Sequence, residues 1–74
     1  MTKIIYNYNK LLGRMREQRL TQSELAKNTG ISEVSLNLKL NNKSFFKQSE
    51  ITRICDVLSI PLDKITTYFF TKNL

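Results

Sequence analysis

The sequence predicts a small, mainly α-helical fold of five helices, with short β segments at its N- and C-terminal ends as a minor addition. Apolar residues recur at helical spacing along most of the chain, and residues 21–40 hold two short helix signatures only a few residues apart. Strand-like composition is confined to the two ends. We expect residues 1–74 to form one domain, because this length supports a single apolar core.

The first helix is expected to start after Asn7 or Asn9, because either side chain can cap it. Its apolar residues recur at helical spacing, and Gly13 weakens it by up to about 1 kcal/mol relative to alanine. The apolar residues are Tyr8, Leu11, Leu12 and Met15.

The second helix is expected to begin at Gln22, because Thr21 and Glu24 form a capping box in which each side chain accepts from the other's amide. Gly30 ends this helix, since it adopts a positive φ at low steric cost. Ala26 is small enough for two steeply crossing helices to approach closely.

The third helix is expected to be capped by Ser32 and to bury Leu36 and Leu40, which lie one turn apart. Residues 22–40 therefore have the spacing of a helix-turn-helix.

A fourth helix is predicted over residues 48–58 from the spacing of its apolar residues. A short fifth helix is predicted to begin at Pro61 and to bury Leu62 and Ile65.

The terminal segments 2–6 and 66–71 have strand composition. They could pair with each other, or with a second subunit as a dimer contact. The alternative is that Phe69 or Phe70 folds back on the helical core.

Composition excludes several classes of function. The net charge of +6 favours a polyanionic partner, although surplus lysine can also serve solubility alone. Without histidine, and with Cys55 as the single cysteine, the chain offers no standard zinc site and no histidine-based catalytic group. We therefore expect no enzyme, no metal and no cofactor. We also expect a cytoplasmic protein with no membrane association and no small-molecule ligand.

Residues 21–40 resemble the helix-turn-helix of the lambda-repressor and Cro-like family, and the similarity extends over residues 8–66. Asn42 replaces the usual glycine after the third helix, and Lys39 occupies a position that is commonly apolar. The matching residues are Gln22, Ala26, Gly30, Ile31 and Leu36. The resemblance implies a five-helix lambda-repressor-like fold and a small phage-type Cro-like transcription regulator.

With Leu36 and Leu40 on the inner side, the outer side of the third helix carries side chains that could read bases in the major groove. The expected base-contacting residues are Glu33, Val34, Asn37 and Leu38. The alternative is that the two apolar members are ordinary exposed residues. The expected DNA-backbone contacts are Gln22, Ser32, Ser35, Lys39, Asn41 and Lys43. For Arg14, Arg16 and Arg19, a solvated helix face is the preferred interpretation.

These expectations combine into a sequence-specific regulator of transcription that binds double-stranded DNA. It would act as a repressor by occupying a pseudo-palindromic operator as a homodimer. The alternative is a protein-interaction module of the same fold, such as an antirepressor or an antitoxin-like partner. In that case Val34, Leu38, Phe45, Phe46 and the C-terminal aromatic residues would form a protein contact.

Overall fold

The computed structural model describes residues 5–72. Within this range the fold is mainly α-helical, with five α-helices, as the sequence predicts. The elements are α1 (Asn9–Glu17), α2 (Gln22–Thr29), α3 (Glu33–Leu40), α4 (Gln48–Leu58), the 3-10 turn η1 (Leu62–Lys64) and α5 (Ile65–Phe69).

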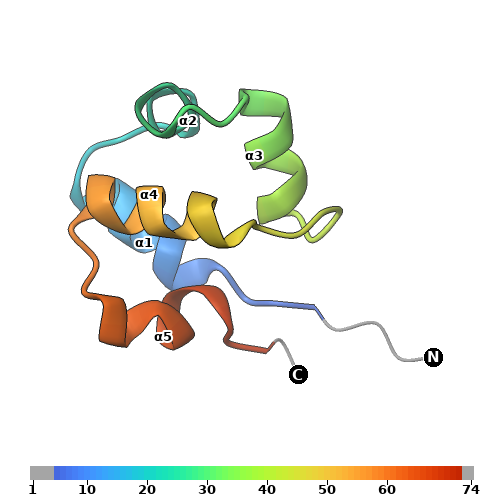
Figure 1. Ribbon diagram of the computed structural model, residues 1–74, viewed down its shortest axis with the longest axis vertical. Coiled ribbons are helices and arrows are strands. Elements are labelled where there is room, and N and C mark those ends of the chain that lie inside the picture. The colour runs from blue at the N-terminus through green and yellow to red at the C-terminus, as the bar shows by residue number, and fades with distance from the viewer. Residues whose placement is uncertain (1–4, 73–74) are drawn as a thin grey trace.

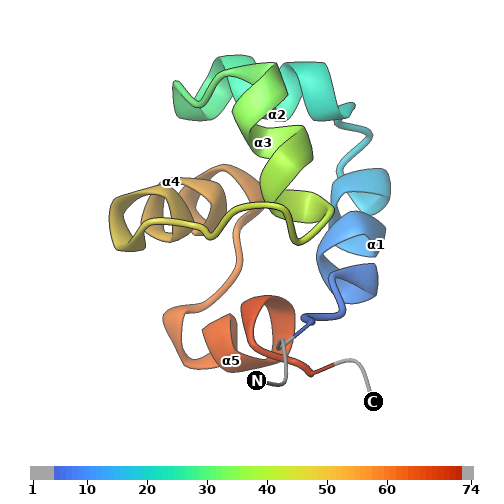
Figure 2. The same cartoon turned by 90° about the vertical axis from the view of Figure 1, so that its right-hand side faces the viewer.

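The helices are arranged so that α3 lies on the outside of the molecule. Figure 1 shows α2 nearly end-on, with α3 running steeply across it at one side. In the view of Figure 2, α3 lies in front of α2, and α4 and α1 lie on either side beneath this pair. The short helix α5 lies at the opposite end of the molecule from α2 (Figures 1 and 2). One long side of α3 therefore faces away from the other helices.

Local capping interactions explain the limits of α2 and α3. Thr21 Oγ1 accepts from the Glu24 amide at 3.1 Å, and Glu24 Oε1 accepts from the Thr21 amide at 3.1 Å, so the predicted capping box is present. Gly30 closes α2 with a φ of 75°. Ser32 Oγ then accepts from the Ser35 amide at 3.1 Å and caps α3.

Substitution of the two glycines by alanine is expected to change stability in opposite directions. Gly30→Ala should lower the free energy of unfolding by about 1–2 kcal/mol, because an alanine at its φ of 75° is strained. Gly13→Ala should raise it by about 0.5–1 kcal/mol, because Gly13 is helical and a Cβ there meets nothing within 4 Å. Urea unfolding measures both, and shifts of the same sign would contradict this account.

The core joins all five helices through aliphatic and aromatic side chains. Leu11, Leu25, Leu36, Ile54 and Leu58 are fully buried. Their removal from water is the main stabilising contribution in a domain of this size. The remaining core residues are Tyr8, Met15, Ala26, Ile31, Ile51, Cys55, Ile60 and Phe69.

The C-terminal strand expected over 66–71 is wrong for most of its length, because residues 65–69 are helical and Phe69 lies in the core. Burial, and not an extended backbone, accounts for this aromatic composition. The ends do meet in one place. Tyr6 and Lys72 form an isolated antiparallel bridge, and the Asn7 amide donates to the Thr71 carbonyl at 2.7 Å. Of the N-terminal segment 2–6, residues 2–4 lie outside the described range.

The expectation that Leu62 is buried is also wrong, because its side chain is 68% exposed. The sequence predicts a helix that begins at Pro61, but Pro61 lies one residue before η1 and Leu62 is the first residue of this turn. Ile65 is partly buried against the core. Across the described residues, no helix combines the length and the apolar character that a membrane crossing requires.

Candidate functional site

The outer side of α3 presents an exposed apolar surface. Val34 is 72% exposed and Leu38 is 43% exposed. They lie one turn apart, on the side away from the fully buried Leu36. Exposed Glu33 and Asn37 flank them. The four side chains expected to contact bases therefore share one accessible face, which we call the α3 face (Glu33, Val34, Asn37, Leu38).

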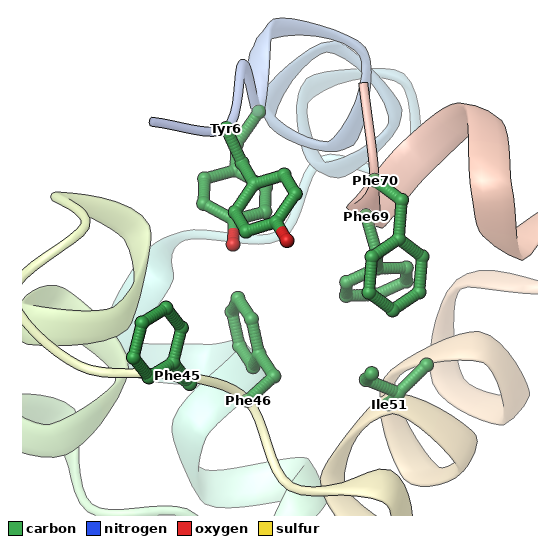
Figure 3. A pocket seen from close by; sticks show the side chains of 7 residues that line it. Tyr6, Phe45, Phe46, Ile51, Phe69 and Phe70 are labelled. Carbon is green, nitrogen blue, oxygen red and sulfur yellow. The ribbon is translucent and has the colours of Figure 1, made fainter. Parts of the chain in front are cut away.

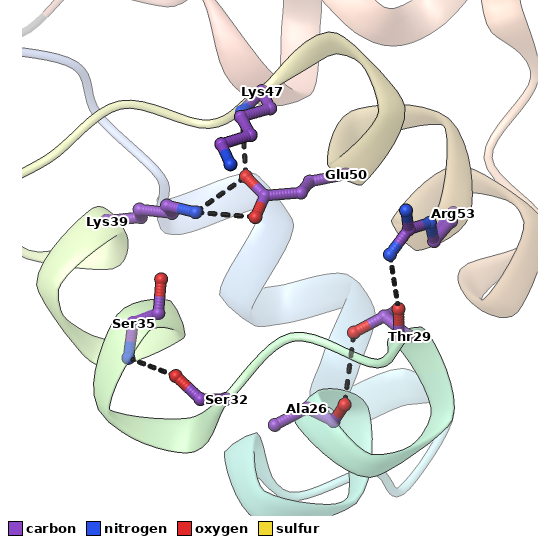
Figure 4. A network of polar contacts seen from close by, with 8 residues as sticks. All are labelled: Ala26, Thr29, Ser32, Ser35, Lys39, Lys47, Glu50 and Arg53. Carbon is purple, nitrogen blue, oxygen red and sulfur yellow. Dashed lines mark hydrogen bonds and ion pairs between the residues drawn. The ribbon is translucent and has the colours of Figure 1, made fainter.

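Lys39 does not belong to any accessible surface, which corrects its expected role as a DNA-backbone contact. Its side chain is buried, and its Nζ donates to both carboxylate oxygens of Glu50 at 2.6 Å (Figure 4). Glu50 Oε1 also accepts from the Lys47 amide at 2.8 Å. The pair joins the end of α3 to the first turn of α4, so it fixes where the α3 face stands.

The ionisation of Glu50 follows from these partners. Burial raises the pKa of its carboxyl, but the hydrogen bonds from Lys39 and Lys47 and their positive charges outweigh burial, and the pKa lies below its usual value. Glu50 is therefore ionised at neutral pH, as the buried ammonium of Lys39 requires.

A second polar contact joins the C-terminal end of α2 to α4. Arg53 Nη1, on α4, donates to the carbonyl of Thr29 at 3.1 Å (Figure 4). Thr29 is the last residue of α2, and its hydroxyl donates to the Leu25 carbonyl at 2.8 Å. The α2 C-terminus, whose last carbonyls lack helical partners, is thus tied to α4.

The other expected DNA-backbone contacts lie around α3 in different environments. Ser32 uses its hydroxyl to cap α3, and Asn41 Nδ2 donates to the Asn37 carbonyl at 2.8 Å. Gln22 and Ser35 are half-buried, whereas Lys43 is exposed.

An aromatic cluster packs where the segment between α3 and α4, residues 41–47, meets the two ends of the described chain. Phe46 packs edge-on against Tyr8 at a ring-centroid distance of 5.5 Å and against Phe69 at 5.4 Å. Tyr6 meets Phe70 in the same geometry at 5.9 Å. Figure 3 shows these rings around a pocket of about 70 Å³. Its lining consists of Tyr6, Tyr8, Phe45, Phe46, Ile51, Phe69 and Phe70.

Phe45 behaves differently from the neighbouring Phe46. Its side chain is 72% exposed, whereas Phe46 packs against the core. The protein contact that the sequence allowed for both residues is therefore open to Phe45 and largely closed to Phe46. Phe45 lies between α3 and α4, at the rim of the aromatic pocket, and adds a second exposed apolar side chain to this part of the surface.

Sequence reasoning missed two long-range contacts of polar side chains. The Tyr6 amide donates to Asn42 Oδ1 at 2.9 Å, and Asn42 Nδ2 donates to the Tyr6 carbonyl at 3.0 Å. Asn42 has a φ of 61°, which explains why it can replace a glycine at this position. Arg14 is not a freely solvated side chain, because its Nε donates to the Leu58 carbonyl at 2.9 Å.

The thiol of Cys55 is buried. Cys55 lies in the core, where burial and, to a smaller extent, the charge of Asp56 raise the pKa of its thiol. Within residues 5–72, no group of three or more His, Cys, Asp or Glu side chains is placed to hold a metal ion.

Comparison with known proteins settles the family. Residues 4–72 match the family described as "Protein of unknown function (DUF739)". The chain belongs to the DUF739 family. Among the curated proteins, no match to this DUF739 chain was found. A solved structure is similar: the solution structure of the modulator of repression (MOR) of the temperate bacteriophage TP901-1 from Lactococcus lactis. It is 40% identical, with 88% of each chain covered and a TM-score of 0.76.

These findings correct the assignment to the lambda-repressor and Cro-like family, because the matches are DUF739 and a modulator of repression. The residues behind that assignment included Ala26, Gly30 and Leu36, which are a small residue, a turn residue and a core residue. Such positions determine how two helices pack, and packing alone identifies neither a family nor a function.

Proposed function

We propose that this protein is a protein-interaction module that modulates a phage repressor by binding a protein of the repression machinery through the α3 face and Phe45. It would act without catalysis, in the cytoplasm of the host. The observation that carries the proposal is the exposure of Val34, at 72%, and Leu38 on α3 of a chain 40% identical to a phage modulator of repression.

The chemistry of this surface favours a protein partner. Val34, Leu38 and Phe45 offer apolar side chains that gain from leaving water. Polar Asn37 and Glu33 at the edge supply direction and specificity. The buried Lys39–Glu50 pair holds α3 in place, so little conformational freedom is lost when a partner binds.

Binding of double-stranded DNA by α3 is the second candidate, favoured by the net charge of +6 and the exposed amide of Asn37. Useful sequence specificity would then require a homodimer on a pseudo-palindromic site. Salt separates the two candidates. DNA affinity falls steeply and linearly with the logarithm of salt concentration, whereas the affinity that an apolar contact of the α3 face contributes to protein binding changes little.

Val34→Asp is expected to weaken binding to the repressor encoded in the same phage or prophage genome by about 30-fold, which corresponds to about 2 kcal/mol at a central interface residue. The charge would have to be desolvated in an apolar contact. The variant should fold normally, because Val34 is exposed and an acidic residue is favoured in the first turn of a helix. Calorimetric titration and a repression reporter measure the effect.

Leu62→Asn is the control, since Leu62 is as exposed as Val34 but lies in η1, and a neutral residue adds no negative charge beside Lys64. It should bind the repressor as the unaltered protein does. Equal losses for both variants, or no repressor binding by the unaltered protein, would reject the proposal.

A further inference from the structure

We infer that a groove between α1 and the connection from α4 to α5 binds an acidic, partly apolar segment of a partner protein. We call it the basic groove, with a volume of about 610 Å³. Its lining consists of Lys10, Arg14, Ser59, Ile60, Pro61, Lys64, Thr67 and Tyr68. The inference rests on the proposed function in taking the partner to be a protein, and it adds a second contact remote from α3.

Three cations converge on the basic groove from different parts of the chain. Lys10 and Arg14 lie one turn apart on α1, so they point to the same side, and Lys64 faces them from η1. No carboxylate lines the groove. Within the described range, neither lysine is engaged in an ion pair, because the ion pair found there joins Lys39 and Glu50. The groove thus has positive charge available for a ligand.

Arg14 is already held in position for binding. Its Nε donates to the Leu58 carbonyl at 2.9 Å and its Nη2 to the Ser59 carbonyl at 3.4 Å. Both carbonyls lie at the C-terminal end of α4, where a cation is favoured. A guanidinium has five N–H donors, so these two bonds leave donors for a carboxylate without further loss of side-chain freedom.

The shape and the floor of the groove indicate what kind of anion it takes. A volume of about 610 Å³ is much larger than a single small anion needs. The lining also includes the buried Ile60, Pro61 and the half-buried Tyr68, which add apolar atoms to the same groove. A lining that combines cations with apolar side chains matches a peptide that carries both carboxylates and apolar side chains. A nucleic-acid backbone would instead present phosphates along its whole length.

The test is a titration followed by amide chemical shifts, using a short synthetic peptide rich in glutamate and interspersed with leucine. Shifts are expected at the amides of residues 10, 14, 59, 60, 64, 67 and 68. Lys10→Glu/Lys64→Glu should weaken binding roughly tenfold or more, because two exposed ion pairs are replaced by repulsion. Higher salt should weaken binding by the unaltered protein. Lys10→Gln/Lys64→Gln provides the same test if the charge reversal disturbs folding.

Arg16→Glu/Lys27→Glu is the matched control, because both residues are exposed, neither lines the groove, and the net charge changes equally. Binding by this variant should stay within about twofold. Equal weakening by the two double variants, equal binding of the glutamine version of the peptide, or shifts outside the groove would overturn the inference. So would a short DNA duplex of equal charge that binds the groove more tightly. Because the probe is a peptide, these outcomes are independent of Val34→Asp, which tests the α3 contact.

Discussion

Replacing Glu50 with alanine is expected to lower the free energy of unfolding by about 3–5 kcal/mol, because the ammonium of Lys39 would remain buried without its carboxylate. The two groups are 2.6 Å apart, and both side chains are almost fully enclosed. The loss is a large fraction of the total for a small domain, which is about 5–15 kcal/mol. Urea unfolding followed by circular dichroism measures it.

The double variant Lys39→Met/Glu50→Leu is the control, because apolar replacements of similar volume remove both buried charges together. It should be clearly more stable than Glu50→Ala. If the two variants lose the same stability, the charge pair is not the cause of the effect.

Acid should remove the contribution of Glu50 in the unaltered protein. Burial raises the pKa of Glu50, but the hydrogen bonds and charges of Lys39 and Lys47 lower it by more than burial raises it. The carboxyl therefore has a lower pKa in the folded than in the unfolded chain. The stabilisation is therefore fully present above the unfolded-state pKa and is lost as pH falls through the folded-state pKa. Glu50→Ala should accordingly lose less stability on acidification than the unaltered protein does.

Phe69→Ala is expected to cost about 3–5 kcal/mol, because it removes a large side chain from a closely packed site. Phe69 is 2% exposed, and its ring meets Phe46 edge-on. At about 4–8 °C per kcal/mol for a domain of this size, the melting temperature should fall by more than about 10 °C, or the chain should not fold. Scanning calorimetry measures the change.

Phe45→Ala is the matched control within the same pocket, since Phe45 is 72% exposed. Its effect on stability should stay within about 0.5 kcal/mol. Equal losses for Phe45→Ala and Phe69→Ala would show that the burial of Phe69 against Phe46 does not provide the expected stability.

Helix limits could be predicted wherever they depend on neighbouring residues. The capping box of Thr21, the positive φ of Gly30 and the cap of Ser32 each involve contacts within a few positions, and all three are observed. The C-terminal segment could not be predicted in this way. Thr66 to Phe70 favour a strand by composition, but the burial of Phe69 beneath α1 and α4 makes the segment helical.

The candidate site could be predicted only in part. Helical geometry correctly placed Val34 and Leu38 on the outside of α3. The prediction that Lys39 is exposed and contacts the DNA backbone was wrong, because its partner Glu50 comes from another helix. A lysine at a usually apolar position, followed by a glutamate in the first turn of the next helix, was the available signal. What the α3 face binds is not encoded in the packing residues, so they led to the wrong family.

Because Cys55 is buried, the reactivity of its thiol reports how often the core opens. It is the single cysteine of the chain, it is 2% exposed, and its raised pKa keeps it protonated and unreactive in the folded state. A thiol reagent can therefore modify it only when the surrounding helices open. The labelling rate reports how often that happens, without any added probe and in each variant described above.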